Sequence, residues 1–429
     1  MNRLDLPPDL RAGPVVDRAD FPALDREVDS QPLVYLDTAA TALKPRQVID
    51  AEAEFYRRYD GAVHRGSHAI GLAATEIYEQ ARAKTAAFFG VQAPEIIWVK
   101  NATEALNLVA YGLLAANIDA RAGSPIDERL RIQAGDTIAV TVAEHHANFV
   151  PWQQLAKRLG AHFHVVDTTD TGELRPEAFA NLPDRTRVLA VTHASNVTGA
   201  LTPVAAAVSA ARERGALTVL DACQSAAHLP LDFHQLDVDF AAASAHKLMG
   251  PTGLGILYGR TELLRALPPF LTGGSMVALV ERDRTIFLDP PQKFEAGTQM
   301  TAQVAAMGAA IDYLHAAPME RIASYDLALG AYLRDQISEI DGVRIIGPQG
   351  GKHLGLVAFA FADIHPHDVG QVLDVRGIAV RVGHHCAQPI HRRLGVQSST
   401  RASVGAYTTV AEVDAFIVEL ARVTEFFRR

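Results

Sequence analysis

One lysine of this chain stands where a charged side chain is unusual. Lys247 follows an apolar run, Val238–Ala243, that is typical of a buried strand, and a glycine- and proline-rich turn comes directly after it. Burying an ammonium group without a partner is costly. The lysine is therefore either a surface residue at a strand end or a residue kept there for its chemistry. One chemistry that needs a desolvated lysine is a Schiff base to an aldehyde cofactor, because a lowered pKa frees the amine lone pair.

Polar motifs also follow three other apolar runs in the same part of the chain. They are Glu144–Asn148, Ser195–Gly199 and Asp221–Ser225. In a mostly parallel sheet, ligands bind at the carboxyl ends of the strands, which meet at one edge. A single polar group at such an end is more often structural than functional. Four strand ends that together carry an ammonium, imidazoles, an amide and a carboxylate favour a binding site.

Pyridoxal phosphate is a cofactor that requires such a set of groups. It needs a lysine for the imine, a carboxylate that keeps its ring nitrogen protonated, and a ring stacked on its face. Lys247, Asp221 and His145 would supply these in turn. The carboxylate would stabilise the protonated nitrogen by a charge-assisted hydrogen bond.

The remaining polar groups would hold the phosphate and the substrate side of the cofactor. Thr103 opens a helical pattern directly after a predicted strand, and the N-terminus of a helix favours an anion. A plain helix cap explains the same residues. Ser244 and His246 would join Thr103 at the phosphate. Gln224 and Asn196 would donate to the phenolic oxygen and hold the substrate side.

The two cysteines differ in their surroundings. Cys386 lies beside two histidines and just after Gly383, in a polar loop that follows a short strand. This setting favours a reactive thiol over an inert one. Cys223 sits at the end of an apolar strand, so we expect it in the core. Two cysteines make no disulfide framework and fit a reducing cytoplasm.

Apolar, β-rich runs that alternate with helical stretches must position these groups. The runs are Ile96–Val99, Thr137–Val142, His162–Val166, Val188–Thr192, Leu217–Leu220, Phe240–Ala243 and Leu254–Tyr258. This alternation predicts an α/β fold with a mostly parallel seven-stranded sheet covered by helices on both faces. After about Pro318 the pattern becomes α+β, which indicates a smaller C-terminal domain.

We expect three segments along the chain. Residues 1–32 form an N-terminal arm that packs with the small domain, residues 33–315 form the large cofactor-binding domain, and residues 316–429 form the small domain with the Cys386 loop. The net charge of −9 disfavours nucleic acid and anionic membranes as partners. No run is long enough to span a membrane, and Met1–Arg11 lacks the apolar stretch of a signal peptide. We therefore expect a cytoplasmic protein.

Together these motifs resemble those of the cysteine desulfurases, a group within the class-V aminotransferase family. The motifs are Asp221–Ser225, Ser244–Lys247, Glu144–Asn148 and Arg381–Ala387. The last one resembles the second group of that family, the SufS type of the SUF iron–sulfur assembly system, since the first group carries its cysteine in a longer loop. The likeness runs from about Asp20 to the C-terminus. It implies a homodimer with the fold type I architecture of pyridoxal phosphate enzymes.

The resemblance also implies a role for each residue at the cofactor. Lys247 would carry the Schiff base and move the proton at the substrate's Cα, Asp221 would pair with the ring nitrogen, and His145 would stack on the ring. Gln224 would bond the phenolic oxygen. The phosphate would be held by Thr103, Ser244 and His246, with Thr298 of the other subunit.

On the substrate side, the resemblance implies that Arg401 clamps the carboxylate of L-cysteine with Asn196, as bidentate arginine recognition predicts. Arg381 would lie near the catalytic loop. The Cys386 thiolate would attack the substrate sulfur, which leaves alanine and a persulfide on Cys386. An acceptor would then take that sulfur in a second step.

Two acceptors fit the resemblance. A zinc-containing SufU-type acceptor would exchange a zinc ligand with His367, because histidine is a good zinc ligand. A surface histidine at a helix start explains His367 as well. A SufE-type acceptor carries no zinc. No metal site is expected in the chain itself.

Other functions remain open on the same residues. A selenocysteine lyase shares every cofactor residue and does not need the thiol nucleophile. Another lyase or epimerase of the family, such as a kynureninase-like lyase, would make Cys386 incidental. A non-catalytic assembly scaffold is the alternative from a different class, against which Lys247 and Asp221 argue.

Overall fold

A computed structural model describes residues 6–427. Its largest sheet has seven strands in the order β4-β10-β9-β8-β7-β5-β6. The strands are β4 (Ile96–Val99), β5 (Thr137–Thr141), β6 (His162–Val166), β7 (Thr186–Thr192), β8 (Leu217–Asp221), β9 (Phe240–Ser244) and β10 (Gly255–Gly259). β10 runs antiparallel to both of its neighbours, and the other pairs are parallel. The predicted α/β fold with a mostly parallel seven-stranded sheet is confirmed.

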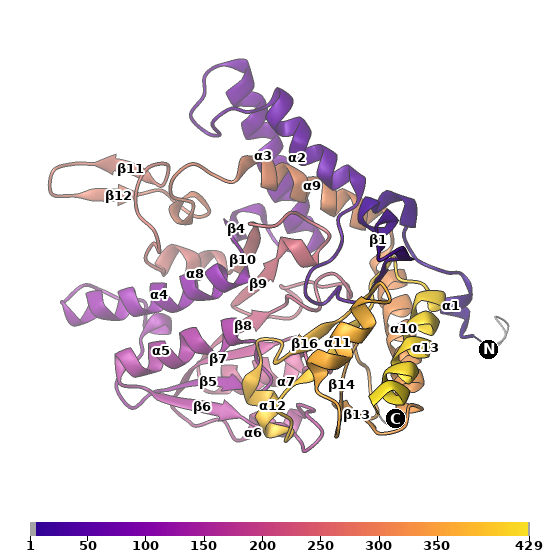
Figure 1. The fold of residues 1–429 in the computed structure, drawn as a ribbon. Coiled ribbons are helices and arrows are strands. Elements are labelled where there is room, and N and C mark those ends of the chain that lie inside the picture. Colours follow the sequence, from indigo (N-terminus) through magenta and orange to yellow (C-terminus); the bar gives the residue numbers. More distant parts are fainter. Residues whose placement is uncertain (1–5, 428–429) are drawn as a thin grey trace.

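Helices cover both faces of this sheet (Figure 1). One face packs against α2 (Arg46–Arg58), α3 (Ala69–Phe88), α7 (Val204–Glu213) and α9 (Thr301–Ala316). The other packs against α4 (Ala102–Arg121), α5 (Val150–Leu159) and α8 (Thr261–Ala266). Successive residues of β4 alternate between the two cores: Ile96 and Trp98 belong to the first, Ile97 and Val99 to the second. Because both faces are buried, the strand is an unbroken apolar run in the sequence.

The C-terminal part of the chain forms a four-stranded antiparallel sheet in the order β13-β14-β17-β16. Its strands are β13 (Val343–Ile346), β14 (Leu356–Phe361), β16 (Arg381–Gly383) and β17 (Ser399–Ser403). α10 (Met319–Ser338), α11 (Pro366–Asp374) and α13 (Val410–Phe427) share its core. The strand expected over Ile378–Arg381 is divided, because β15 (Ile378–Ala379) pairs with β3 (Val34–Tyr35) near the N-terminus instead.

The N-terminal segment packs against both the C-terminal sheet and the core of the large sheet. Leu6 and Leu10 pack into the core of the C-terminal sheet, whereas Phe21 belongs to the large core and contacts the ring of Tyr407. The first five residues of the predicted arm lie outside the described residues. The boundaries expected at residues 32/33 and 315/316 stay a prediction.

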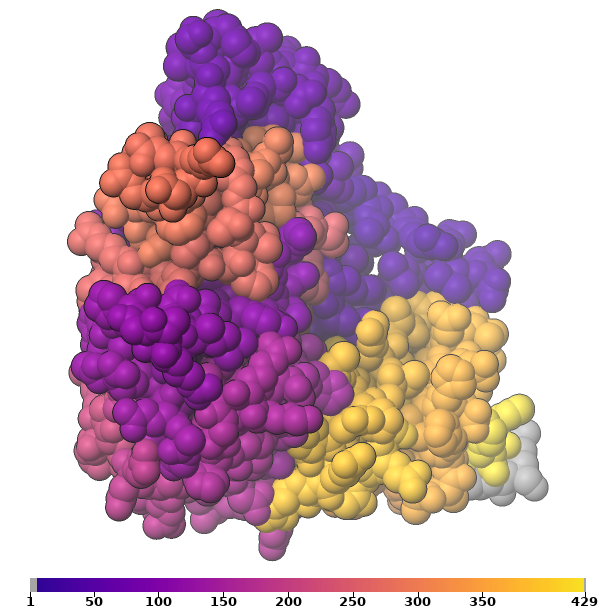
Figure 2. All heavy atoms as spheres, turned by 90° about the vertical axis from the view of Figure 1, so that its left-hand side faces the viewer, coloured from indigo at the N-terminus to yellow at the C-terminus, as the bar shows by residue number. Residues whose placement is uncertain are grey.

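Smaller elements complete the chain. They are α1 (Pro8–Arg11), β1 (Glu27–Val28), β2 (Gln31–Pro32), α6 (Pro176–Ala180), β11 (Val277–Val280), β12 (Thr285–Phe287) and α12 (Gln388–Arg393). β11 and β12 form a hairpin that projects from the body (Figure 1). Figure 2 faces that side of the molecule and shows the C-terminal segment, in yellow, packed beside the magenta middle part of the chain. Between residues 6 and 427, no helix has the length and apolarity that crossing a membrane requires.

Candidate active site

The carboxyl ends of β8 and β9 border a cavity of about 260 Å³. The N-terminus of α4 and residues of the C-terminal sheet close its other sides. All but two of the predicted site residues line it, namely Thr103, His145, Asn196, Asp221, Gln224, Ser244, His246, Lys247, Arg381, Cys386 and Arg401. The exceptions are Thr298 and His367. The structure thus brings the predicted residues together, while their individual roles stay a prediction.

Lys247 ends a short 3₁₀ turn, η7 (Ala245–Lys247), directly after β9. The chain after β3 holds this turn, because the N–H of Ala42 donates to the carbonyl of His246 (3.0 Å). Nζ of Lys44 donates to the carbonyl of Ala42 (2.7 Å) and fixes that segment in turn. Lys247 is half-buried and belongs to the cavity wall. The turn therefore places the amine of Lys247 at the cavity, and Lys247 is not a surface residue at a strand end.

Asp221 is the last residue of β8 and is only 5% exposed. Its Oδ1 accepts the N–H of Cys223 (2.9 Å), which fixes the carboxylate at the strand end. Nearby, Nε2 of Gln224 donates to the carbonyl of Ala39 (3.0 Å). A carboxylate fixed in this way is suited to stabilise a protonated ring nitrogen through a charge-assisted hydrogen bond.

Cys223 packs against the apolar core on one face of the sheet, as predicted, but it also faces the cavity. The residue is partly buried and lines the cavity, because β8 ends at Asp221 and the chain has already turned at Cys223. Burial, followed by the charge of Asp221, raises the pKa of the Cys223 thiol. Cys223 therefore remains a protonated thiol at neutral pH and is a poor nucleophile.

The N-terminus of α4 is built to face the cavity. An ideal Cβ at Gly255 would lie 2.4 Å from Cα of Asn101, so only glycine lets β10 approach the start of this helix. Oδ1 of Asn101 accepts the N–H of Glu104 (2.9 Å), and Oγ of Ser244 accepts the N–H of Ala102 (2.9 Å). Thr103 stays exposed at the first turn. The helix end offers a hydroxyl and its positive dipole to an anion.

Two histidines of the cavity are neutral at physiological pH. Burial lowers the pKa of His145 to about 4, and it also lowers the pKa of His246 to about 4, with Lys247 adding to the effect. Nδ1 of His145 accepts the N–H of Ala147 (3.1 Å), which orients the ring at the start of η6 (His146–Asn148). A neutral, oriented imidazole is suited to stack on an aromatic cofactor ring.

A buried network lies beneath His145. Glu144 is fully buried and accepts hydrogen bonds from Oγ1 of Thr141 (2.6 Å), Nδ2 of Asn148 (2.6 Å) and the N–H of Thr192 (2.8 Å). Oδ1 of Asn148 accepts the indole N–H of Trp152 (2.9 Å). Burial raises the pKa of Glu144 to about 8. The network joins the ends of β5 and β7 to η6 and α5, and so fixes the turn that carries the two histidines.

Arg401 of β17 lies at the C-terminal side of the cavity and is 3% exposed. It donates to the carbonyl of Asn196 (2.8 Å) and forms an ion pair with Asp37 (3.5 Å), which also pairs with Arg381 (3.7 Å). Burial lowers the pKa of Arg401 to about 10, so the guanidinium stays charged at pH 7. Nε of Arg401 and Oδ1 of Asn196 are buried without a hydrogen-bond partner. Unpaired buried polar atoms are costly and indicate a polar ligand here.

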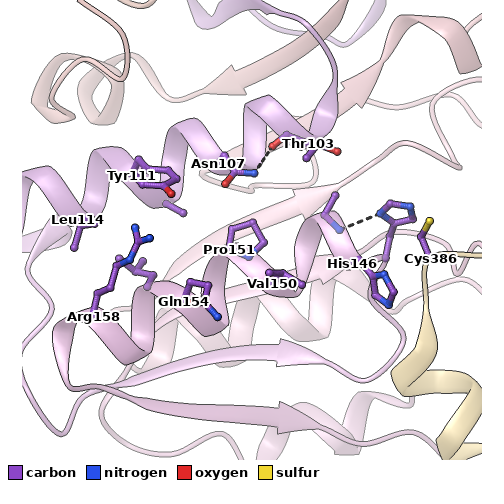
Figure 3. Close-up of a pocket in the computed structure, with 14 residues that line it drawn as sticks. Thr103, Asn107, Tyr111, Leu114, His146, Val150, Pro151, Gln154, Arg158 and Cys386 are labelled. Atoms are coloured by element: carbon purple, nitrogen blue, oxygen red, sulfur yellow. Dashed lines mark hydrogen bonds between the residues drawn. The ribbon is translucent and has the colours of Figure 1, made fainter.

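Cys386 lies between this cavity and a second one of about 430 Å³ that runs along α4 and α5. Figure 3 shows the second cavity, with Tyr111 and Arg158 at one end and His146 and Cys386 at the other. Cys386 is exposed and adopts a left-handed backbone conformation with φ of +54°. Its thiol is therefore reachable both from the polar cavity and from outside.

Thr298 and His367 lie elsewhere on the chain. Thr298 is exposed in the segment between the β11–β12 hairpin and α9, and the N–H of Gly297 beside it donates to the carbonyl of Gly274 (3.0 Å). His367 is exposed in the first turn of α11, where its N–H donates to Nδ1 of His365 (3.2 Å). Neither residue contributes to the cavity of its own chain.

Sequence reasoning missed three residues at this site. Asp37 pairs with both arginines, His146 contacts the Cys386 loop, and Glu144 anchors the turn between them. Glu144 and His146 flank His145 in one motif, so their position in the sequence was a signal. Asp37 follows a short strand and carried no signal beyond that position.

The residues present fit pyridoxal phosphate. A half-buried amine, a fixed carboxylate and a capped helix N-terminus surround one cavity, and unpaired polar atoms of Asn196 and Arg401 border it. These are the groups that the cofactor and an anionic substrate require. Within the described part of the chain, no group of three or more His, Cys, Asp or Glu side chains is placed to hold a metal ion.

Known proteins resemble this chain over nearly its whole length. The family model described as aminotransferase class-V matches residues 34–416. A probable cysteine desulfurase 2 of Mycobacterium leprae is 48% identical over 96% of this chain and 97% of its own length. The cysteine desulfurase of Cronobacter sakazakii is 44% identical over 95% and 97%. The crystal structure of the cysteine desulfurase CsdA of Escherichia coli superposes with a TM-score of 0.85 at 38% identity, covering 96% of this chain and 98% of that one.

Proposed function

The chain belongs to the aminotransferase class-V family, and on that premise we propose that it moves sulfur from L-cysteine to Cys386 and on to an acceptor for iron–sulfur cluster assembly. It is an enzyme of the cysteine desulfurase type, with pyridoxal phosphate as cofactor and the fold type I architecture. The observation that carries the proposal is the position of Cys386, exposed at the junction of the Lys247 cavity and the outer cavity. A thiol there has access to substrate on one side and to an acceptor on the other.

The cofactor's place follows from the fixed groups. Lys247 would bind it, Asp221 would pair with its ring nitrogen and neutral His145 would stack on its face. Its phosphate would lie at the N-terminus of α4, with Thr103, Ser244 and His246, and Gln224 would donate to its phenolic oxygen. Once bound, pyridoxal phosphate supplies an electron sink for negative charge at the substrate's Cα.

Arg401 and Asn196 would hold the carboxylate of L-cysteine. Arg401 lies on β17 and Asn196 follows β7; both line the cavity, and both keep a buried polar atom unpaired. Arg381 lies more openly beside them and shares Asp37 with Arg401. A planar guanidinium recognises a carboxylate by two parallel hydrogen bonds. This clamp would orient the substrate sulfur toward Cys386.

The chemical step then divides between Lys247 and Cys386. Lys247 moves the proton at Cα, and the thiolate of Cys386 forms an S–S bond with the substrate sulfur. The C–S bond breaks and its electron pair takes up a proton at Cβ, so the substrate leaves as L-alanine and the sulfur stays as a persulfide on Cys386. A thiol of the acceptor then attacks the outer sulfur and restores Cys386.

We further propose that the enzyme is a homodimer in which Thr298 completes the phosphate site of the partner subunit. Thr298 is exposed beside a hairpin whose Leu279, Val280 and Ile286 are also exposed, and exposed apolar patches mark interfaces. The arrangement gives each site a residue from each subunit.

Mixing two impaired variants tests this arrangement. A Lys247→Ala homodimer and a Thr298→Ala homodimer should both be impaired, whereas the mixed dimer contains one site with a native Lys247 and a native Thr298. We expect the Thr298→Ala homodimer to bind cofactor about tenfold more weakly, since it lacks one phosphate contact. The mixed dimer should recover up to half of the wild-type activity per dimer. No recovery on mixing, with subunit exchange verified, would show that Thr298 acts within its own chain or not at all.

The acceptor is proposed to be of the zinc-containing SufU type, with the SufE type as the alternative. His367 is exposed on α11, which packs against β16, the strand that leads into the Cys386 loop. An acceptor that places a zinc ion at His367 would therefore lie near the sulfur donor.

Desulfuration in the presence of each purified acceptor distinguishes them. We expect a zinc-loaded SufU-type acceptor to raise alanine formation, and His367→Ala to lower this stimulation about tenfold without changing the rate measured with a small thiol reductant. His365→Ala is the matched control, because it removes a neighbouring exposed imidazole. Stimulation that survives His367→Ala, or that requires only a zinc-free SufE-type acceptor, counts against the SufU assignment.

A further inference from the structure

His146 contacts the Cys386 loop with both its backbone and its side chain. The N–H of His146 donates to the carbonyl of Cys386 (2.7 Å). Nε2 of the His146 ring accepts the N–H of Gln388 (3.2 Å), the first residue of α12. One residue of the large part thus binds the C-terminal loop at the cysteine itself and two residues after it.

The loop needs such contacts because its backbone is strained. His385 and Cys386 both adopt left-handed conformations, with φ of +49° and +54°. Non-glycine residues adopt this conformation rarely and at an energetic cost, so the surroundings must hold them there. His385 is buried and anchored: its Nε2 lies 2.9 Å from Oγ of Ser399, and its carbonyl accepts Nδ2 of Asn196 (2.5 Å). Beyond Cys386, the Gln388 N–H bonds the His146 ring, and Ala387 packs in a small apolar cluster with Val142 and Val197 of the large part.

A buried hydrogen-bond network fixes the turn that carries His146. His146 is the first residue of η6, whose last residue, Asn148, belongs to the buried network of Glu144 and Trp152. The preceding residue, His145, faces the Lys247 cavity. The same short turn therefore orients the ring-stacking histidine and holds the loop that carries the thiol.

From this arrangement we propose that His146 is a positioning residue for sulfur transfer, which holds the Cys386 loop at the cavity by accepting the Gln388 N–H. The inference rests on the proposed function, since it assigns His146 a role only if Cys386 is the sulfur carrier. His146 touches neither substrate nor cofactor in this role. It fixes the distance between the thiol and the substrate sulfur, on which the rate of attack depends steeply.

The chemistry of the contact requires a neutral imidazole at Nε2. Burial and the nearby His384 lower the pKa of His146 below that of an ordinary histidine. The ring is consequently unprotonated at neutral pH and has the lone pair that Gln388 needs.

Two substitutions of His146 distinguish the role of its hydrogen-bond acceptor from the role of its packing. His146→Gln places an amide oxygen at about the reach of Nε2, whereas His146→Leu fills similar space without an acceptor. The measured quantity is the rate of persulfide formation on Cys386 in a single turnover, with the fully loaded enzyme. We expect His146→Leu to lower this rate about tenfold, because a loop without this contact places the thiol less accurately against the substrate sulfur. His146→Gln should stay within about threefold of the wild type.

A second measurement distinguishes a damaged cofactor site from the loss of the His146–Gln388 contact. In both variants, the yellow absorbance of the lysine-bound cofactor and the KM for L-cysteine should match the wild type, so that only kcat changes. His146→Leu with a normal persulfide rate, or His146→Gln as slow as His146→Leu, overturns the proposal. A Cys386→Ser enzyme that still desulfurates cysteine would instead overturn the proposed function, because that result removes the sulfur carrier itself.

Discussion

Cys386→Ser is expected to lower the conversion of L-cysteine to alanine at least about 10³-fold, because serine supplies no thiolate to attack the substrate sulfur. The yellow absorbance of the lysine-bound cofactor should be unchanged. Cys386 is exposed in the loop after β16 and makes no contribution to the strand ends that hold Lys247 and Asp221. Alanine release is measured with a small thiol reductant present, so that no acceptor protein limits turnover.

Cys223→Ser is the matched control for that variant. Both cysteines line the Lys247 cavity, but the pKa of the Cys223 thiol is raised by burial and by Asp221. We expect this control to retain turnover within a few-fold of the wild type. Testing L-selenocysteine beside L-cysteine separates the alternative activities. Unchanged cysteine turnover in Cys386→Ser would contradict the mechanism and favour a selenocysteine lyase or another lyase of the family.

Lys247→Ala is expected to abolish turnover of both substrates, by at least about 10³-fold, and to remove the lysine-bound absorbance. Without the amine at the end of η7, the chain has no group at this position to bind the cofactor's aldehyde or to move the proton at Cα. The absorption spectrum of the purified variant, recorded with added cofactor, is the direct measurement. Lys247→Arg is the control, since it keeps a positive charge but offers no free amine at neutral pH. Lysine-bound absorbance that persists in Lys247→Ala after unbound cofactor is removed would show that another lysine binds the cofactor.

The two variants should therefore differ in kind. Lys247→Ala loses the spectrum together with the activity, whereas Cys386→Ser keeps the spectrum and loses desulfuration. This difference follows from the division of labour between the strand ends of the large sheet and the loop of the C-terminal sheet. A protein that is only an assembly scaffold would show no lysine-bound absorbance at all.

Much of the large sheet could be predicted because of how its strands are buried. β4 sends alternate side chains into two cores, and so Ile96–Val99 is apolar without interruption. Because most of these strands are parallel, the residues that follow them lie at one edge of the sheet. The convergence of Asp221, Ser244 and Lys247 follows from that rule alone.

Other features depend on contacts between distant segments, which a single sequence does not reveal. Asp37 reaches Arg381 and Arg401 only because β3 pairs with β15 and the N-terminal segment folds back on the C-terminal sheet. The same pairing divides the strand that was expected to run through Ile378–Arg381. The position of Cys223 in the cavity wall could not be predicted, because the apolar run before it obscures the strand end at Asp221.

The His146 contact with Gln388 is of the same kind. It joins residues that are far apart in the chain, and the spacing of neither motif encodes it. The sequence shows His146 as the neighbour of His145, but only the fold shows which residue donates a hydrogen bond to its ring. Residue type thus indicated the chemistry of the site, whereas the coupling of its two halves required the tertiary structure.

Mass analysis of Cys386 after a single turnover with L-cysteine tests the central claim most directly. Wild-type enzyme, mixed with about one equivalent of L-cysteine without reductant or acceptor and then alkylated, should yield one alanine per site. The peptide that contains Cys386 should carry one additional sulfur atom, and the Cys223 peptide none. Alanine formed in equal amount with an unmodified Cys386 peptide, and the sulfur released or found on Cys223, would contradict the account.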